Sequence, residues 1–397
     1  MSRRKPSRRV PWLRPALAVA ALAGFAAAYR FALRYRERVG LPRRSPVETT
    51  PGQFSLDFEE VAIPAGDHDL AAWFVPAGPE RPKPRRRRGR PAAAATGSAE
   101  AASAASHAAT PSNPAPASGP ASERRPAIAI VHGWESNRGR TLAHVRYLHA
   151  AGFHCLALDV RGHGDNPPET LPINVPEFAD DTAAAARWLA ARPDVSAVGV
   201  LGHSMGGAGA IVAAAREPSI EAVVSLSSPS DLVRMTRQTF RMAEMNVPEA
   251  IATPLAWFTA AVLLAPRRRS VESASALAAA GRYRGPLLLV HGAQDHGVPV
   301  RHLELIARAA LTHRGPDDGP VETLVLPEFG HRWLYEDANC RRRTAAFFAR
   351  WLGGPVAPDT AGERAAECVV ERPPDPIYGF GALTSRAPQL ERRPEPD

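Results

Sequence analysis

Apolar residues recur along most of this chain in short continuous runs, and the stretches between the runs have the length of helices. The runs cover residues 127–133, 153–159, 196–203, 220–227, 285–292 and 321–331, and the helix-length stretches include 177–192, 205–216, 299–312 and 336–352. Strands that are apolar throughout are typical of a parallel sheet with helices on both faces. The pattern therefore predicts an α/β fold, in which ligands bind at the carboxyl ends of the strands.

Two segments near the start have a different pattern. Residues 54–63 read FSLDFEEVAI and residues 68–76 read HDLAAWFVP, with a Gly-Asp pair between them. Strand-like runs joined by such a turn predict an antiparallel pair that opens the domain.

Two other segments lack the composition of a folded domain. Residues 79–126 contain ERPKPRRRRGRP and continue with Ala, Ser and Pro, nearly free of large apolar side chains. Such a segment cannot bury enough surface to offset its chain entropy, so we expect a disordered insertion. Residues 354–397 are expected to form a disordered C-terminal tail. The folded domain is thus predicted to comprise opening strands at 45–78 and a core at 127–353.

The N-terminal segment has basic residues on both sides of an apolar stretch. Residues 15–29 carry no charge, and four arginines follow them: Arg30, Arg34, Arg36 and Arg38. One helix over about residues 12–33 could cross a bilayer, so residues 1–44 are predicted to form a basic N-terminus with a single-pass membrane anchor. The alternative is a signal peptide cleaved near the alanines at 26–28 and an exported protein, but the basic cluster disfavours translocation of the mature end.

The net charge of +9 belongs to these appended segments. Residues 1–44 carry +11 and residues 79–126 carry +6, which leaves −8 for the remainder. Basic residues confined to such segments do not predict a nucleic-acid partner. The three cysteines, Cys155, Cys340 and Cys368, have no CxxC spacing, so neither a disulfide framework nor a zinc site is expected.

One short motif carries the candidate chemistry. Residues 202–206 read GHSMG, directly after an apolar run and before an alanine-rich stretch. The spacing fits G-x-S-x-G, a strand-to-helix turn that raises a serine above the sheet as a nucleophile. A side chain at either glycine would collide with the neighbouring strand or helix. We therefore predict that Ser204 is the nucleophile.

A serine nucleophile needs a base, and the base needs an acid that orients it. Asp295, in VHGAQDHGVP, and His331, in PEFGHRW, each follow a strand-like run, and the order Ser204, Asp295, His331 is the one expected for this turn. His296 is the competing base and Asp231 the competing acid.

Two backbone amides are predicted to stabilise the oxyanion. The helix that follows the nucleophile supplies the amide of Met205, and the loop after IVHGW supplies that of Trp134. Four histidines near strand ends, His132, His163, His203 and His291, raise the question of a metal. Their spacing matches no HxH or HExxH pattern, so no metal and no cofactor are expected.

Five motifs together resemble the α/β-hydrolase superfamily. They are HGWESNRGR, LALDVRGHGD, GHSMGG, HGAQDHGVP and EFGH, and the resemblance covers residues 54–78 and 127–353. It implies a mostly parallel eight-stranded sheet and acyl transfer by Ser204, Asp295 and His331. It also implies that Asp159 and Arg161 shape the site as structural elements, and that about residues 232–283 form a small helical lid.

The sequence thus predicts a membrane-anchored serine hydrolase that cleaves a carboxylic ester through an acyl-enzyme on Ser204. Its expected partners are a small-molecule acyl substrate and the membrane. A peptidase or thioesterase that uses the same residues is the alternative enzyme within the superfamily. A binding protein of the same fold without catalytic activity is the alternative that is not an enzyme.

Overall fold

The computed structural model describes residues 13–78, 124–312 and 314–372. The predicted insertion at 79–126 lies almost entirely outside these ranges. Residues 373–397, most of the predicted tail, lie outside them as well.

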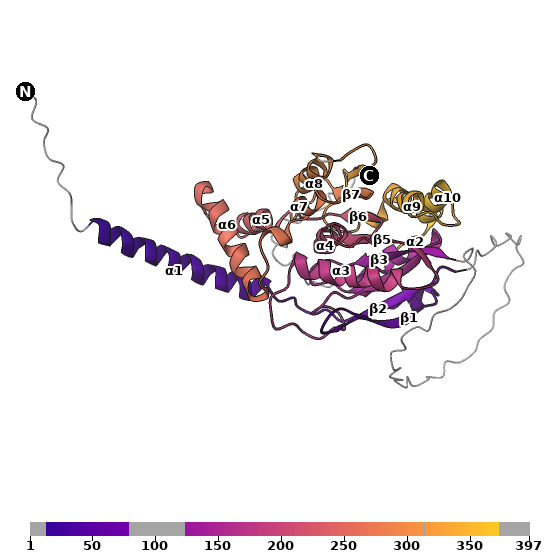
Figure 1. Cartoon of the computed structure of the whole chain (residues 1–397), viewed down its shortest axis with the longest axis horizontal. Coiled ribbons are helices and arrows are strands. Elements are labelled where there is room, and N and C mark those ends of the chain that lie inside the picture. The colour runs from indigo at the N-terminus through magenta and orange to yellow at the C-terminus, as the bar shows by residue number, and fades with distance from the viewer. Residues whose placement is uncertain (1–12, 79–123, 313, 373–397) are drawn as a thin grey trace, which may run out of the picture.

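The described residues form an eight-stranded sheet in the order β1-β2-β4-β3-β5-β6-β7-β8 (Figure 1). The strands are β1 (Glu59–Pro64), β2 (Asp69–Val75), β3 (Arg125–Val131), β4 (His154–Leu158), β5 (Val195–His203), β6 (Ala222–Leu226), β7 (Leu287–Gly292) and β8 (Val321–Leu326). β2 pairs antiparallel with β1 and with β4, and the other neighbours are parallel. Every residue of β4, β6 and β7 is buried. The predicted sheet and its antiparallel opening pair are confirmed.

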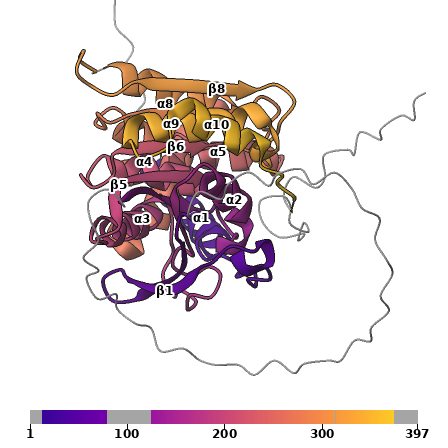
Figure 2. The same cartoon turned by 90° about the vertical axis from the view of Figure 1, so that its right-hand side faces the viewer.

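Helices cover both faces of the sheet, and each face has its own apolar core. One core includes residues of α3 (Val175–Ala190), α4 (Met205–Ala214), α7 (Ala276–Ala280) and α8 (Arg301–Thr312). The other includes residues of α2 (Leu142–Ala150), α9 (Ala338–Leu352) and α10 (Pro358–Glu367). Figure 2 shows α9 and α10 side by side, as their contacts require.

The C-terminal helix α10 corrects one predicted boundary. We expected a disordered tail from residue 354, but residues 358–367 form a helix whose Ala361 and Ala365 are fully buried against the domain. Small side chains let α10 approach α9 closely, so the segment packs without large apolar residues. Arg341 of α9 donates to the carbonyls of Ala365 and Ala366 and so satisfies the end of α10. The folded domain therefore extends at least to residue 367.

The chain between β6 and β7 is mostly helical, as predicted for residues 232–283. It forms α5 (Leu232–Met242), α6 (Glu249–Leu264) and α7. Ala260, Leu263 and Leu264 of α6 belong to the core on one face of the sheet. Among the described residues, the segment Glu249–Arg267 is the one helix whose length and composition would suffice to cross a membrane, and 33% of it is buried in the protein.

α1 (Leu13–Val39) is one continuous helix that extends away from the body of the molecule (Figure 1). Its C-terminal part packs on α5, where the rings of Phe31 and Tyr35 lie 5.7 and 6.4 Å from that of Phe240. From residue 18 to residue 27 every side chain is exposed. The anchor predicted over about residues 12–33 thus corresponds to the outer part of a longer helix. Trp12 lies outside the described residues.

A buried ion pair fixes the loop after β4. The Asp159 carboxylate pairs with the Arg138 guanidinium, and it also accepts the backbone N–H groups of Arg138 at 2.6 Å and Asp165 at 3.0 Å. Both side chains of the pair are buried, and the guanidinium lies 4.4 Å from the ring centre of Trp73. Burial raises the pKa of Asp159, whereas Arg138 and the two amides oppose that change.

Removal of this carboxylate should destabilise the whole domain. We expect Asp159→Ala to lower the free energy of unfolding by about 3–5 kcal/mol, because the buried guanidinium of Arg138 loses its buried partner and keeps only the half-exposed Asp165. The measurement is chemical denaturation followed by circular dichroism. The matched control is Asp165→Ala, which removes a half-exposed carboxylate from the same arginine and should cost about 1 kcal/mol or less. Equal effects of the two substitutions would contradict the assignment.

Candidate active site

The predicted site residues follow three strands that end at the same edge of the sheet. Ser204 comes directly after β5, Asp295 follows β7, and His331 follows β8. These strands are parallel, so their carboxyl ends bring the three residues together.

The turn at Ser204 is strained and closely packed. Ser204 has φ 55° and ψ −120°, a conformation that few residues with a side chain adopt. Its amide donates to the carbonyl of Leu226, and its own carbonyl accepts the amides of the next turn. A Cβ atom at Gly202 would lie 2.3 Å from the Gly206 carbonyl oxygen, and one at Gly206 would lie 2.3 Å from the His132 carbonyl oxygen. The predicted collisions at both glycines are confirmed.

Ser204, His331 and Asp295 form a hydrogen-bonded chain. His331 Nε2 lies 3.0 Å from Ser204 Oγ, and His331 Nδ1 lies 2.6 Å from Asp295 Oδ2. A carboxylate only accepts hydrogen bonds, so Nδ1 carries the proton and Nε2 is left to accept the serine hydroxyl. The Asp295 side chain is fully buried, whereas a quarter of the His331 side chain is exposed. The base can therefore reach a substrate, and the acid is shielded from water.

Several donors hold Asp295 as a carboxylate. Burial alone would raise its pKa, but hydrogen bonds from His291 and His331, and the amide of Val298 at 2.7 Å, together hold that pKa well below its ordinary value. His291 Nε2 lies 3.5 Å from Asp295 Oδ2 and donates to the Val298 carbonyl at 2.7 Å. The carboxylate is thus charged and fixed in direction.

The two competing residues lie elsewhere in the hydrogen-bond network. Asp231 is the N-cap of α5: it accepts the Arg234 amide at 2.9 Å, and it also pairs with the Arg234 side chain. The backbone carbonyl of His296 accepts a hydrogen bond from Gln238. Within the part of the chain that the structure describes, Asp231 and His296 form no hydrogen bond with Ser204 or His331, so the geometry favours Asp295 and His331.

The two residues predicted to supply the oxyanion amides, Trp134 and Met205, line the same cavity as Ser204. Gly133 packs so closely that a Cβ atom there would be 3.1 Å from the Ser204 Cβ, which places the following residue, Trp134, near the nucleophile. Met205 is the first residue of α4, and its helix points its N-terminal amides toward the same place. His132 Nδ1 donates to the Gly133 carbonyl at 2.7 Å and so fixes the Gly133–Trp134 peptide plane.

Sequence reasoning missed the role of His203. Its Nε2 donates to the backbone carbonyl of His331 at 2.8 Å, and the two rings lie 5.0 Å apart. Burial lowers the pKa of His203 to about 3, so its ring is neutral. Its position inside the G-x-S-x-G motif was the one available signal, because that residue must lie next to the nucleophile.

The four histidines near the strand ends do not form one group. His132 and His163 lie against each other with ring centres 5.0 Å apart, whereas His203 lies beside His331 and His291 beside Asp295. Within the described ranges there is no group of three or more His, Cys, Asp or Glu side chains that could hold a metal ion.

A cavity of about 730 Å³ opens in front of Ser204. The strand ends form its floor, and α1, α5 and α6 contribute walls through Tyr35, Met235 and Leu263 among others. The cavity therefore has a polar floor with the serine and an apolar wall, part of which comes from the N-terminal helix.

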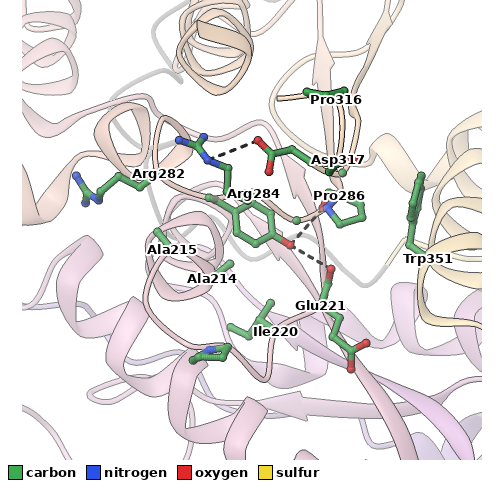
Figure 3. Close-up of a pocket in the computed structure, with 15 residues that line it drawn as sticks. Ala214, Ala215, Ile220, Glu221, Arg282, Arg284, Pro286, Pro316, Asp317 and Trp351 are labelled. Carbon is green, nitrogen blue, oxygen red and sulfur yellow. Dashed lines mark hydrogen bonds and ion pairs between the residues drawn. The ribbon is translucent and has the colours of Figure 1, made fainter. Parts of the chain in front are cut away.

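A second depression of about 720 Å³ lies at the opposite edge of the sheet. Figure 3 shows Arg282 and Arg284 on one side of it and Trp351 on the other. Tyr283 and Glu221 also line this depression, and the Tyr283 hydroxyl donates to the Glu221 carbonyl at 3.3 Å. The described residues that line it include no serine, cysteine or histidine, so they supply none of the usual nucleophiles for acyl transfer.

Parts of the chain are similar to known proteins. Residues 122–266 match the family model for serine aminopeptidase S33 proteins. The chain is 26% identical over 208 residues to Rv2307c of Mycobacterium tuberculosis (52% of this chain, 63% of that protein) and 26% identical over 221 residues to human protein ABHD12B (53% and 56%). It thus matches about three fifths of the length of these relatives.

A solved structure shares the fold over most of the chain. The esterase Pf2001 of Pyrococcus furiosus superimposes with a TM-score of 0.55 at 20% identity, covering 79% of this chain and 98% of the esterase. Together with the strand order and the turn at Ser204, this similarity shows that the chain has the α/β-hydrolase fold.

Proposed function

We propose that this protein is a serine hydrolase that cleaves carboxylic esters through an acyl-enzyme on Ser204. The observation that carries the proposal is the hydrogen-bonded chain from Ser204 Oγ to His331 Nε2 and from His331 Nδ1 to Asp295, at the floor of an open cavity. A binding protein without catalysis would have no need to hold a serine in a strained turn against a base.

In the proposed acylation step, Ser204 Oγ attacks the carbonyl carbon of the ester while His331 Nε2 takes the hydroxyl proton. The carbonyl oxygen gains negative charge and accepts hydrogen bonds from the Met205 and Trp134 amides. The bond to the leaving oxygen then breaks, and the imidazolium returns its proton to that oxygen. An alcohol leaves, and the acyl group remains on Ser204.

Deacylation repeats these steps with water as the nucleophile. His331 Nε2 removes a proton from a water molecule, which attacks the acyl carbon, and the Ser204 oxygen leaves with the same proton. The product is a carboxylic acid. Asp295 stays charged throughout and stabilises the imidazolium, and His203 and His132 hold the backbone of the base and of the oxyanion loop.

The charges around the cavity favour an ester over a peptide with a free amino terminus. The carboxylates that line it are those of Glu135, Asp231 and Asp295. Asp231 is paired with Arg234, Asp295 with His331, and Glu135 accepts the Arg43 amide at 3.2 Å. Asp231 and Asp295 are thus engaged by cationic or imidazole side chains, and within the described wall only Glu135, whose partner is a neutral amide, could receive an ammonium group. The name of Pf2001, an esterase, supports the same choice.

A peptidase remains the second candidate, because the family model that matches residues 122–266 is that of serine aminopeptidases. A thioesterase would use the same three residues. Parallel assays of p-nitrophenyl esters, acyl thioesters and aminoacyl p-nitroanilides separate the three, and we expect the ester to be the best substrate by kcat/KM.

Loss of the nucleophile tests the enzyme itself. We expect wild-type protein to react covalently with a fluorophosphonate probe, and Ser204→Ala and His331→Ala each to abolish labelling and reduce ester turnover by about a millionfold. The double variant should be hardly worse than either single variant, because the residues act as one unit. Labelling is read by mass spectrometry of the tryptic peptide.

The control for that experiment is Ser55→Ala, which alters another serine with a positive φ that lies outside the site. It should keep full labelling. Folded wild-type protein that neither labels nor hydrolyses any activated ester would refute the hydrolase and leave the binding protein in its place.

The choice between the two candidate acids has its own test. Asp295→Asn should leave the fold intact and reduce turnover by about ten thousandfold, because an amide can donate to Nδ1 and so favours the wrong imidazole tautomer. Asp231→Asn should reduce turnover by less than about tenfold, because that residue caps α5 and does not touch His331. Steady-state kinetics with p-nitrophenyl acetate measures both, and the reverse order of effects would assign the acid to Asp231.

We also propose that the outer part of α1 anchors the protein in a membrane. Its side chains from residue 18 to residue 27 are exposed on all sides of the helix and carry no charge. A helix that is apolar all round needs an apolar medium. The full chain should therefore stay with membranes through carbonate extraction and keep its N-terminal residues, as read by immunoblotting and N-terminal sequencing. A soluble protein that begins near Tyr29 would indicate a cleaved signal peptide instead.

A further inference from the structure

Exposed apolar side chains gather where α1 and α6 leave the body of the molecule. On α1 they include Val19, Leu22 and Phe25, and on α6 they include Ile251 and Trp257. Leu22 is 70% exposed, and Ile251 and Trp257 are each 55% exposed. Of the thirteen large apolar residues that the described chain exposes, seven lie on these two helices or on the loop before α6: Val19, Leu22, Phe25, Tyr29, Met245, Ile251 and Trp257.

The two helices contact each other at this surface. Phe258 of α6 packs edge-on against Phe25 of α1 with ring centres 5.6 Å apart, and it lies 6.5 Å from the ring of Tyr29. Arg36 reaches the Val262 carbonyl at 3.5 Å. In Figure 1 the outer end of α6 points away from the sheet on the same side as α1. Any apolar phase that surrounds the outer part of α1 therefore also meets the outer face of α6.

α6 cannot itself cross that phase, although its composition would allow it. Ala256, Ala260 and Leu263 are buried, and the last two belong to the core beside the sheet. The helix can therefore offer only its outer face, which Ile251, Pro254 and Trp257 share at spacings of three residues. This is the geometry of a helix that lies in a membrane interface rather than across it.

The charges next to this surface favour a lipid bilayer as its occupant. Arg30, Arg34 and Arg38 are exposed and lie four residues apart, so they form one stripe along α1 just where its apolar part ends. Arginines at that level pair with lipid phosphates, and tryptophan is enriched at the same depth. A second copy of this chain would bring another arginine stripe to the same place and would be repelled by it.

The cavity at Ser204 opens between the same helices. Tyr35, Arg38 and Val39 of α1 line it together with Met235 of α5 and Leu263 of α6. Tyr35 also contacts Phe240 and Thr239 of α5. The wall of the cavity is therefore built in part from the same two helices that carry the exposed apolar side chains.

We propose that the outer face of α6, with Ile251 and Trp257 at its centre, lies in the membrane interface beside α1, and that the cavity takes amphiphilic long-chain acyl esters directly from the bilayer. The hydrolysis rests on the proposed esterase function, and the seating of α6 rests on the proposed anchoring of α1 but not on catalysis. In this arrangement α1 holds the protein in the membrane, and α6 brings the mouth of the cavity to the lipid surface.

The central experiment compares two substrates on one variant. Full-length protein is reconstituted in vesicles of phosphatidylcholine and phosphatidylglycerol, and Ile251→Glu/Trp257→Glu is assayed with p-nitrophenyl palmitate dissolved in the bilayer and with soluble p-nitrophenyl acetate. We expect about a tenfold or larger loss of activity on the palmitate, because two carboxylates are expelled from the interface. Activity on the acetate should be unchanged, which also shows that the variant is folded.

The matched control is Leu311→Glu/Trp351→Glu. These side chains are 58% and 38% exposed but belong to α8 and α9, away from α1. They should leave both activities unchanged. If the two double variants lose the same activity on the palmitate, the effect is general and the special role of α6 is refuted.

A second readout does not depend on catalysis. Lipids brominated near the head of the acyl chain should quench tryptophan fluorescence of the wild type more than that of Trp257→Phe, whereas Trp351→Phe should be quenched like the wild type. Equal quenching of the wild type and Trp257→Phe would overturn the proposal. A concentration-dependent dimer that Ile251→Glu/Trp257→Glu abolishes would overturn it as well, and would assign the outer face of α6 to a second copy of the chain. Quenching at Trp257 in a protein without any esterase activity would refute the proposed function alone.

Discussion

The close approach of α4 to the ends of β3 and β5 is the constraint on which the site depends. Gly202 and Gly206 leave room for the first turn of α4 to lie directly against the backbone of His132. Only then does Ser204 adopt its strained conformation and reach His331 Nε2. Strain of about 1–3 kcal/mol at one residue is small beside the burial of two apolar cores, so the fold can hold a conformation that the local sequence disfavours.

The charge states of the buried histidines and of Asp295 then fix the groups that packing brings together. Burial lowers the pKa values of His132 to about 4 and of His203 to about 3, so both rings are neutral and act as fixed hydrogen-bond donors. Asp295 is buried as a charge and faces the one imidazole that touches the nucleophile. Two kinds of buried group therefore have separate tasks: neutral histidines fix the backbone, and the carboxylate fixes the base.

The sequence predicted those parts that depend on local pattern. Continuous apolar runs indicated six of the eight strands, two runs joined by a Gly-Asp turn indicated the antiparallel opening pair, and the glycines around Ser204 indicated its turn. Contacts between distant segments could not be read in the same way. α10 packs through Ala361 and Ala365, which resemble the alanines of a disordered segment. The hydrogen bond from His203 to the His331 carbonyl joins residues 128 positions apart, and no periodicity records it.

The sequence also indicated only one of the two features of α1. Its charge-free stretch indicated a membrane anchor, but Tyr35, Arg38 and Val39 gave no sign that they would wall the cavity. One rigid helix joins the exposed apolar end to that wall, because α1 continues without interruption from Leu13 to Val39. Phe31 and Tyr35 hold the inner turns of α1 against Phe240 and Thr239 of α5. The same helix therefore carries the exposed apolar side chains at one end and part of the cavity wall at the other.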